Sequence, residues 1–141
     1  MTYATQADLV TRFGEEDLIR LTDRADPPLD AIDSAVVAAA LADAEAVIDG
    51  YVATRYTLPL ATTPLLLRQL ECDLAWFILQ RGNPTEDAQK RQQAAIAMLR
   101  DVSKGALSLG PDAANAVPTD AGGVQVSAGD AVFTPGTLAD Y

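Results

Sequence analysis

The chain has 141 residues and a formal net charge of −10, from 20 acidic and 10 basic residues, and it contains no histidine. Its length suits a single domain, and its acidic excess disfavours sequence-independent DNA binding because such a chain repels phosphate backbones. Without histidine it lacks the commonest general base and the commonest zinc ligand, so we expect neither catalysis nor a bound metal or cofactor.

Two short helices are predicted at the N-terminus. Thr5 can cap the first helix, Asp8 lies in its first turn, where an acid is favourable, and Gly14 is a natural stop. The second short helix runs from Glu15 to about Thr22. The double proline at positions 27–28 then forbids a helix and predicts an extended loop.

Three long amphipathic helices are predicted to form the body of the domain. They span residues 33–54, 64–82 and 86–104, where apolar residues recur every three or four positions. The first contains Gly50, which costs about 1 kcal/mol against alanine in a helix and which we interpret as a site of close helix approach. The apolar stripes are Val37, Leu41, Ala44, Ile48 and Tyr51; Leu67, Leu70, Leu74, Phe77 and Ile78; and Ala95, Met98, Leu99 and Val102.

The starts of these long helices carry capping signals. Either Asp33 or Asp30 can cap the first. The Thr63 hydroxyl is expected to cap the second, with Pro64 at its first helical position. Thr85 follows a Gly-Asn-Pro break and is expected to cap the third.

Two segments outside the helices are predicted to contact partners. The Arg55–Leu60 loop holds apolar residues that should be tucked under the domain or against a partner, while its arginine and tyrosine can serve the helix end, an interface or both. The tail, residues 111–141, alternates apolar residues like a β-hairpin or an edge-pairing strand. The candidate contact residues are Arg55, Tyr56, Leu58, Pro59 and Leu60 in the loop, and Val124, Val126, Val132 and Phe133 in the tail.

Side chains that resemble reactive groups have simpler explanations. The acids at 15–17 and 86–87 open helices, where the helix dipole favours them. Cys72 lies within a predicted helix with no histidine to activate it, so we interpret it as a core thiol. A lone cysteine fits a reducing cytosol, and no apolar run approaches the ~20 residues that a membrane span needs.

Four segments in order carry a family likeness. They are LTDR at 21–24, AEAVIDGYVATRYTLPL at 44–60, Pro64 and Leu67 followed by CDLA at 72–75, and the spaced residues from Ala95 to Gly110. With these segments, residues 1–110 resemble the small neck proteins of Mu-like phages and prophages. That family is similar to the helical head–tail connector proteins.

The resemblance implies an all-α fold and an assembly role. We expect a small antiparallel bundle of about five helices, three long and two short, over residues 1–110, followed by the extended tail at 111–141. The family likeness implies a non-enzymatic virion protein of the neck, assembled in the host cytoplasm. Copies would form a ring, typically dodecameric, beneath the portal protein. The ring would extend the DNA channel without binding DNA specifically and receive the next neck or tail-completion protein.

Two other classes of function stay open at this point. A small acidic cytosolic adaptor of phage origin, or a regulator that mimics DNA, would have the same composition. An enzyme that uses aspartate and glutamate is the other alternative, although no motif in the chain points to a reaction.

Overall fold

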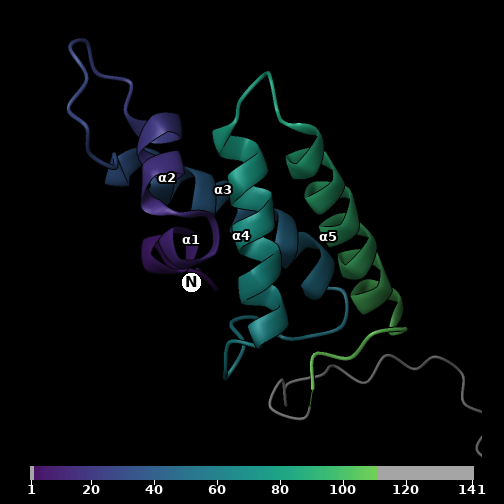
Figure 1. Cartoon of the computed structure of the whole chain (residues 1–141). Helices are drawn as coiled ribbons and strands as arrows, with labels where there is room; N and C mark the ends of the chain where they lie inside the picture. Colours follow the sequence, from purple (N-terminus) through teal and green to yellow (C-terminus); the bar gives the residue numbers. More distant parts are fainter. Residues whose placement is uncertain (1, 111–141) are drawn as a thin grey trace, which may run out of the picture.

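The computed structural model describes residues 2–110, and these residues form five helices and no strand (Figure 1). The helices are α1 (Gln6–Phe13), α2 (Glu15–Thr22), α3 (Ser34–Val52), α4 (Leu65–Leu79) and α5 (Glu86–Lys104). The predicted all-α bundle of three long and two short helices is therefore confirmed. The tail that we expected to be extended or strand-like lies outside the described residues.

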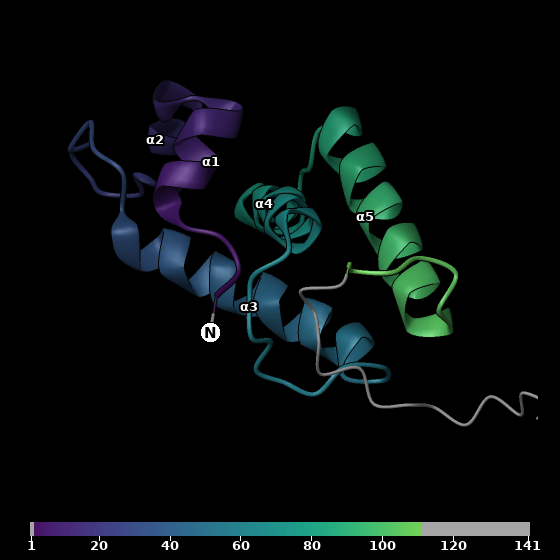
Figure 2. The same ribbon diagram turned by 90° about the horizontal axis from the view of Figure 1, so that it is seen from below.

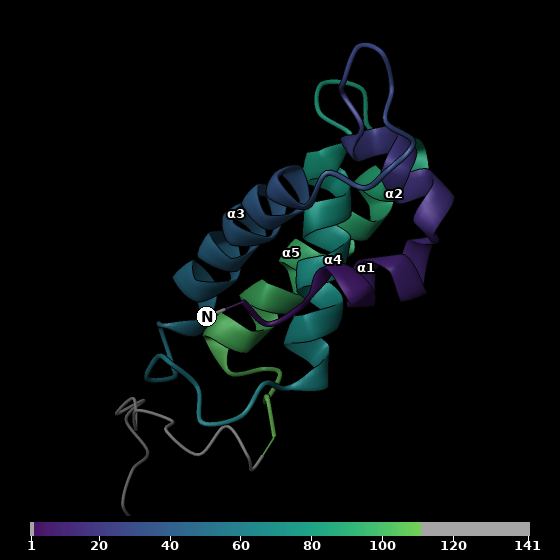
Figure 3. The same ribbon diagram turned by 90° about the vertical axis from the view of Figure 1, so that its left-hand side faces the viewer.

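Helix α4 is the central element of the bundle. It packs against α3 along one side and against α5 along another, and α1 and α2 lie on the opposite side of α4 from α5, where both also contact α3 (Figures 2 and 3). The core lies where these helices meet, because each contributes residues with almost no exposed surface. These include Leu9, Leu18, Val37, Ala44, Ile48, Val52, Leu67, Ala75, Leu99 and Val102.

Side-chain caps fix the starts of three helices as predicted. Thr5 and Asp8 form a reciprocal capping box, in which the Thr5 N–H donates to the Asp8 carboxylate at 2.8 Å. The Asp33 carboxylate accepts the N–H of Ala35 at 2.9 Å, so Asp33 rather than Asp30 is the N-cap of α3. The hydroxyl of Thr85 accepts a backbone N–H in the first turn of α5.

The predicted start of α4 was wrong in detail. Pro64 has an extended backbone and precedes the helix, so the first helical residue is Leu65, and no side chain caps this end. The Pro64 carbonyl accepts the N–H of Arg68 at 3.3 Å and begins the helical hydrogen bonding. Thr63 is therefore one position too early for its hydroxyl to cap α4.

Two other sequence interpretations do not hold. A Cβ placed on Gly50 would meet nothing within 4 Å, so no helix of the described chain approaches closely there. Met98, assigned to the core-facing stripe of its helix, is 41% exposed. Both errors arise because a helical repeat gives a residue's angular position but not the neighbouring element that covers it.

The outer face of α3 is unusually apolar for a surface. We give this name to the exposed side formed by Ala35, Ala38, Ala39, Ala42, Ala46, Val47 and Gly50, with the exposed acid Asp43 among them. By contrast, α5, which also has 19 residues, exposes mainly glutamine and charged side chains. A helix that is apolar on both faces is usually covered on both. Residues 2–110 contain no helix long and apolar enough to cross a membrane.

Candidate partner interface

The Arg55–Leu60 loop is folded against the domain. Tyr56 and Leu60 are buried, and Leu58 is partly buried against the core, whereas Pro59 is exposed. The Tyr56 hydroxyl accepts a hydrogen bond from the backbone N–H of Leu109 at 3.2 Å, which holds the segment after α5 beneath this loop. The first of our two expectations for the apolar residues, that they are tucked under the domain, fits this arrangement.

Arg55 lies against the end of α5. Gly105 terminates that helix with a φ of 78°, and a Cβ at this position would overlap the Arg55 guanidinium. The cation is therefore close to the C-terminal carbonyls of α5, where a positive charge is favourable. This contact supports a structural role for Arg55. Whether the loop also contacts a partner stays a prediction, and the four candidate tail residues Val124, Val126, Val132 and Phe133 lie outside the described residues.

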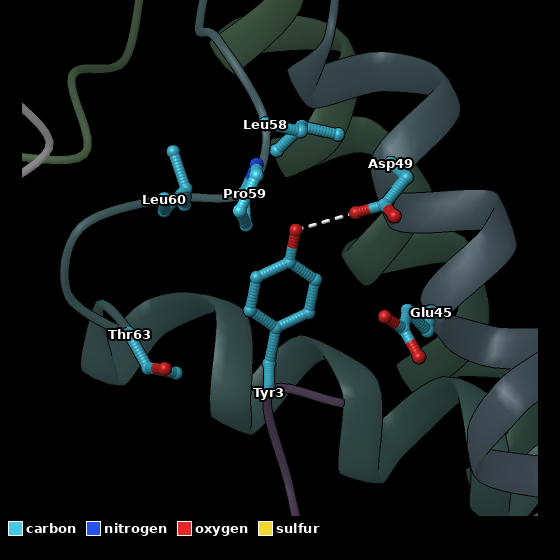
Figure 4. A pocket seen from close by; sticks show the side chains of 7 residues that line it. All are labelled: Tyr3, Glu45, Asp49, Leu58, Pro59, Leu60 and Thr63. Atoms are coloured by element: carbon cyan, nitrogen blue, oxygen red, sulfur yellow. Dashed lines mark hydrogen bonds between the residues drawn. The ribbon is translucent and has the colours of Figure 1, made fainter. Parts of the chain in front are cut away.

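A pocket of about 260 Å³ opens between this loop and α3 (Figure 4). The ring of Tyr3 stands at its centre, and the Tyr3 hydroxyl donates a hydrogen bond to the Asp49 carboxylate. Burial, followed by this hydrogen bond, raises the pKa of Tyr3 above its ordinary value. Leu58, Pro59 and Leu60 line the opposite wall, so the predicted loop does border a concave surface.

Glu71 lies close to this pocket in the interior of the bundle. Its Oε2 accepts the backbone N–H of Ala4, whereas its Oε1 is buried without a hydrogen-bond partner among the described residues. Burial raises the pKa of Glu71 to about 7, against the opposing effect of the Ala4 hydrogen bond, and the nearby acids Glu45 and Asp49 add to the increase. Glu71 therefore fastens the N-terminal segment, and the sequence pattern gave no indication of it.

The chemistry available near Glu71 is limited. Cys72 is buried, and burial raises the pKa of its thiol to about 11, which fits the predicted core thiol. Within residues 2–110, no group of three or more histidine, cysteine, aspartate or glutamate side chains is arranged to hold a metal ion. The features that characterise this pocket are therefore its concave shape and the Arg55–Leu60 loop that borders it.

A second concave surface, which we call the aromatic groove, lies on the side of α4 away from α3. It has a volume of about 460 Å³ and runs between α1, α2, the end of α4 and the start of α5. The rings of Phe13 and Trp76 stack in it with centroids 4.2 Å apart and planes 8° from parallel. No local sequence pattern predicts this stack, because Phe13 and Trp76 come from distant segments of the chain.

An arginine–aspartate network borders the aromatic groove. The Arg12 guanidinium donates two hydrogen bonds to the Asp73 carboxylate, at 3.1 and 3.0 Å. Arg91 lies 3.7 Å from the same carboxylate and 2.7 Å from Asp87. The guanidinium groups of Arg12 and Arg91 also lie within 6 Å of the Phe13 ring centre, at 5.8 and 5.7 Å. Cations, acids and aromatic rings thus contact one another along this border of the groove.

Comparison with known proteins places the chain among phage proteins. The family described as Bacteriophage Mu, Gp36 matches residues 3–128. Gene product J of Escherichia phage Mu is 38% identical over 135 residues, covering 95% of this chain and 95% of that protein. Mu-like prophage FluMu protein gp36 of Haemophilus influenzae is 34% identical over 128 residues, covering 90% and 89%. The likeness thus continues beyond residue 110, where our sequence reading of it ended.

Proposed function

Since the chain belongs to the Bacteriophage Mu, Gp36 family, we propose that it is a structural protein of the phage particle, a head–tail connector subunit. Copies form a ring, which we expect to be dodecameric, beneath the portal protein. The ring extends the DNA channel, receives the next neck or tail-completion protein and performs no catalysis. In this proposal the protein resides in the virion neck after assembly in the host cytoplasm.

The observation that carries this proposal is the outer face of α3. Seven of its exposed residues are alanine, valine or glycine, and Asp43 is the exposed acid among them. Small side chains let another protein surface approach the helix backbone closely, and burying them on association is favoured by the hydrophobic effect. Gly50 fits the same reading, since nothing inside the described chain approaches it.

The charge of the chain is compatible with a channel through which DNA moves. With a net charge of −10, the protein gains nothing from phosphate neutralisation, which supplies most sequence-independent affinity for DNA. A channel wall of this kind lets DNA slide rather than holding it. The same charge keeps free subunits soluble before assembly.

Disruption of the gene in a producing phage tests the connector role. A stop codon early in the gene should yield DNA-filled heads and separate tails, and supply of the intact protein should restore joined particles. Electron microscopy and infectivity measure both. Infectious particles that contain no copy of the polypeptide would exclude this function.

A charge placed on the outer face of α3 tests the surface itself. Ala42→Arg should leave the fold intact, because residue 42 is exposed and arginine is a good helix former. It should nevertheless reduce incorporation into particles at least about 10-fold, since a buried unpaired charge opposes docking. Gln93→Arg is the matched control on the exposed side of α5 and should be incorporated normally. Equal incorporation of both variants would contradict a role for α3.

A further inference from the structure

The loop between α2 and α3 projects from the body of the domain (Figure 1). Its base is closed by Thr22, whose buried hydroxyl accepts the N–H of Asp33 at 3.1 Å. Inside the loop, the Asp23 carboxylate accepts the N–H groups of Leu29 and Asp30, each at 2.8 Å. The projecting loop is therefore held in one shape by its own hydrogen bonds.

This braced loop presents an apolar side chain to solvent. Leu29 is 73% exposed, more than any other large hydrophobic residue noted on the described surface. Two prolines precede it, and Asp26 and Asp30 flank the segment. Single exposed leucines are common on protein surfaces. One held at the tip of a fixed loop is different, because little entropy is lost when it docks.

The aromatic groove is a suitable receptor for such a side chain. Phe13 and Trp76 provide its apolar walls together with Leu21, and Arg12 and Arg20 stand at its edges. Tryptophan and arginine in a concave surface are the residue types that most often dominate association energy. The arginines are already paired, Arg12 with Asp73 and Arg20 with Asp17 at 3.2 Å.

Charge favours this match between loop and groove. The groove is close to neutral because its cations and acids pair, and its guanidinium groups can each donate further hydrogen bonds. A chain with a net charge of −10 repels, on average, a loop that carries Asp26 and Asp30. The groove thus offers the acidic loop a surface without net negative charge.

The loop and the groove are separate surfaces of one molecule. The loop leaves α2, which lines the groove with Asp17, Arg20 and Leu21, and it projects from the body before it enters α3, which contributes no residue to the groove (Figure 1). Leu29 is exposed in its own chain, so it does not occupy its own groove.

We propose that the Leu29 loop of one copy inserts into the aromatic groove of the next copy. Contacts of this head-to-tail kind generate rings or filaments, because each copy keeps one free loop and one free groove. The inference rests on the proposed ring and names the surfaces that join its subunits.

Two variants that each remove one half of the contact test this proposal. Leu29→Ser removes the apolar side chain, and Asn83→Trp fills the groove from an exposed position on its rim. Sedimentation and native mass spectrometry of the full chain over a concentration series should show wild-type oligomers. Each variant alone should associate about 10- to 100-fold more weakly.

Mixing the variants gives the sharpest result. The Leu29→Ser copy keeps an intact groove and the Asn83→Trp copy keeps an intact loop, so the mixture should form dimers but nothing larger. Leu65→Ser is the matched control, because Leu65 is 64% exposed at the start of α4 and takes no part in the groove; it should assemble like the wild type. Circular dichroism checks that all variants are folded.

Three results would overturn the contact: a wild type that stays monomeric throughout, a Leu29→Ser variant that assembles normally, or a mixture that gives no dimer. Each of them can occur while gene disruption still separates heads from tails. The failure of this inference is therefore distinguishable from the failure of the connector role.

Discussion

Replacement of Glu71 with glutamine should change how the stability of the protein depends on pH. Burial raises the pKa of this carboxyl from an ordinary 4.5 to about 7 in the folded chain. Between these two pH values the unfolded chain has released the proton and the folded chain still holds it. Unfolding therefore releases a proton, and the free energy of unfolding falls as the pH rises through this window.

The size of the effect follows from the pKa difference. A difference of about 2.5, between 4.5 and about 7, corresponds to about 3 kcal/mol. Below pH 4.5 the carboxyl is neutral in both states, and above pH 7 it is ionised in both, so the contribution is constant outside the window. Glu71→Gln keeps an oxygen to accept the Ala4 N–H but has no proton to lose, so its stability lacks this term.

Urea unfolding of both proteins at half-unit steps from pH 4 to pH 8.5 measures the effect. The variant should gain about 3 kcal/mol relative to the wild type across this range, with the gain confined to pH 4.5 to 7. All other titrating groups are shared and cancel in the difference. The carboxyl carbon resonance of Glu71 should titrate with a midpoint near 7. Parallel stability curves, or a midpoint close to 4.5, would refute the reasoning.

Three further substitutions test contacts that hold the candidate surfaces. Tyr56→Phe removes the acceptor for the Leu109 N–H and should cost about 1 to 2 kcal/mol in thermal or urea unfolding. Asp73→Asn breaks the paired hydrogen bonds from Arg12 and should cost about 2 kcal/mol, with a loss that shrinks in high salt. Gly105→Ala forces a Cβ into a backbone with a φ of 78° and should destabilise the protein by at least about 1 kcal/mol; a neutral result would contradict the observed helix end.

Local sequence signals predicted the helices well, because capping side chains mark the starts of α1, α3 and α5. Thr5, Asp33 and Thr85 accept backbone N–H groups at the positions expected of them. Helix α3 ends two residues before its expected end, and α4 ends three residues before its expected end. In both places the helical spacing of apolar residues continues, but the backbone leaves the helix. Glycine and proline were informative when they ended an element, and Gly50 misled because it lies inside one.

The concave surfaces could not be predicted in the same way. Phe13 and Trp76 stack although 63 positions separate them in the sequence, and Arg12 reaches Asp73 across 61 positions. No local sequence pattern predicts such pairs, because each of these residues, taken alone, looks like an ordinary surface side chain. Glu71 is similar, because a carboxyl in an apolar stretch signals burial only once the N-terminal segment is seen to cover it.

The candidate contact surfaces share one physical property, which is that they are formed within a single copy. Asp23 braces the loop, the pairing of Arg12 with Asp73 supports the groove, and α3 is held by the core on its inner side. Association through such surfaces orders few additional residues, so substitutions on them should change assembly while leaving the stability of the monomer unchanged. Substitution of Glu71, which is buried in the bundle, should do the reverse. Measuring stability and assembly separately therefore distinguishes two kinds of interface. One kind is already folded in the single copy, and the other folds only when a neighbouring copy binds.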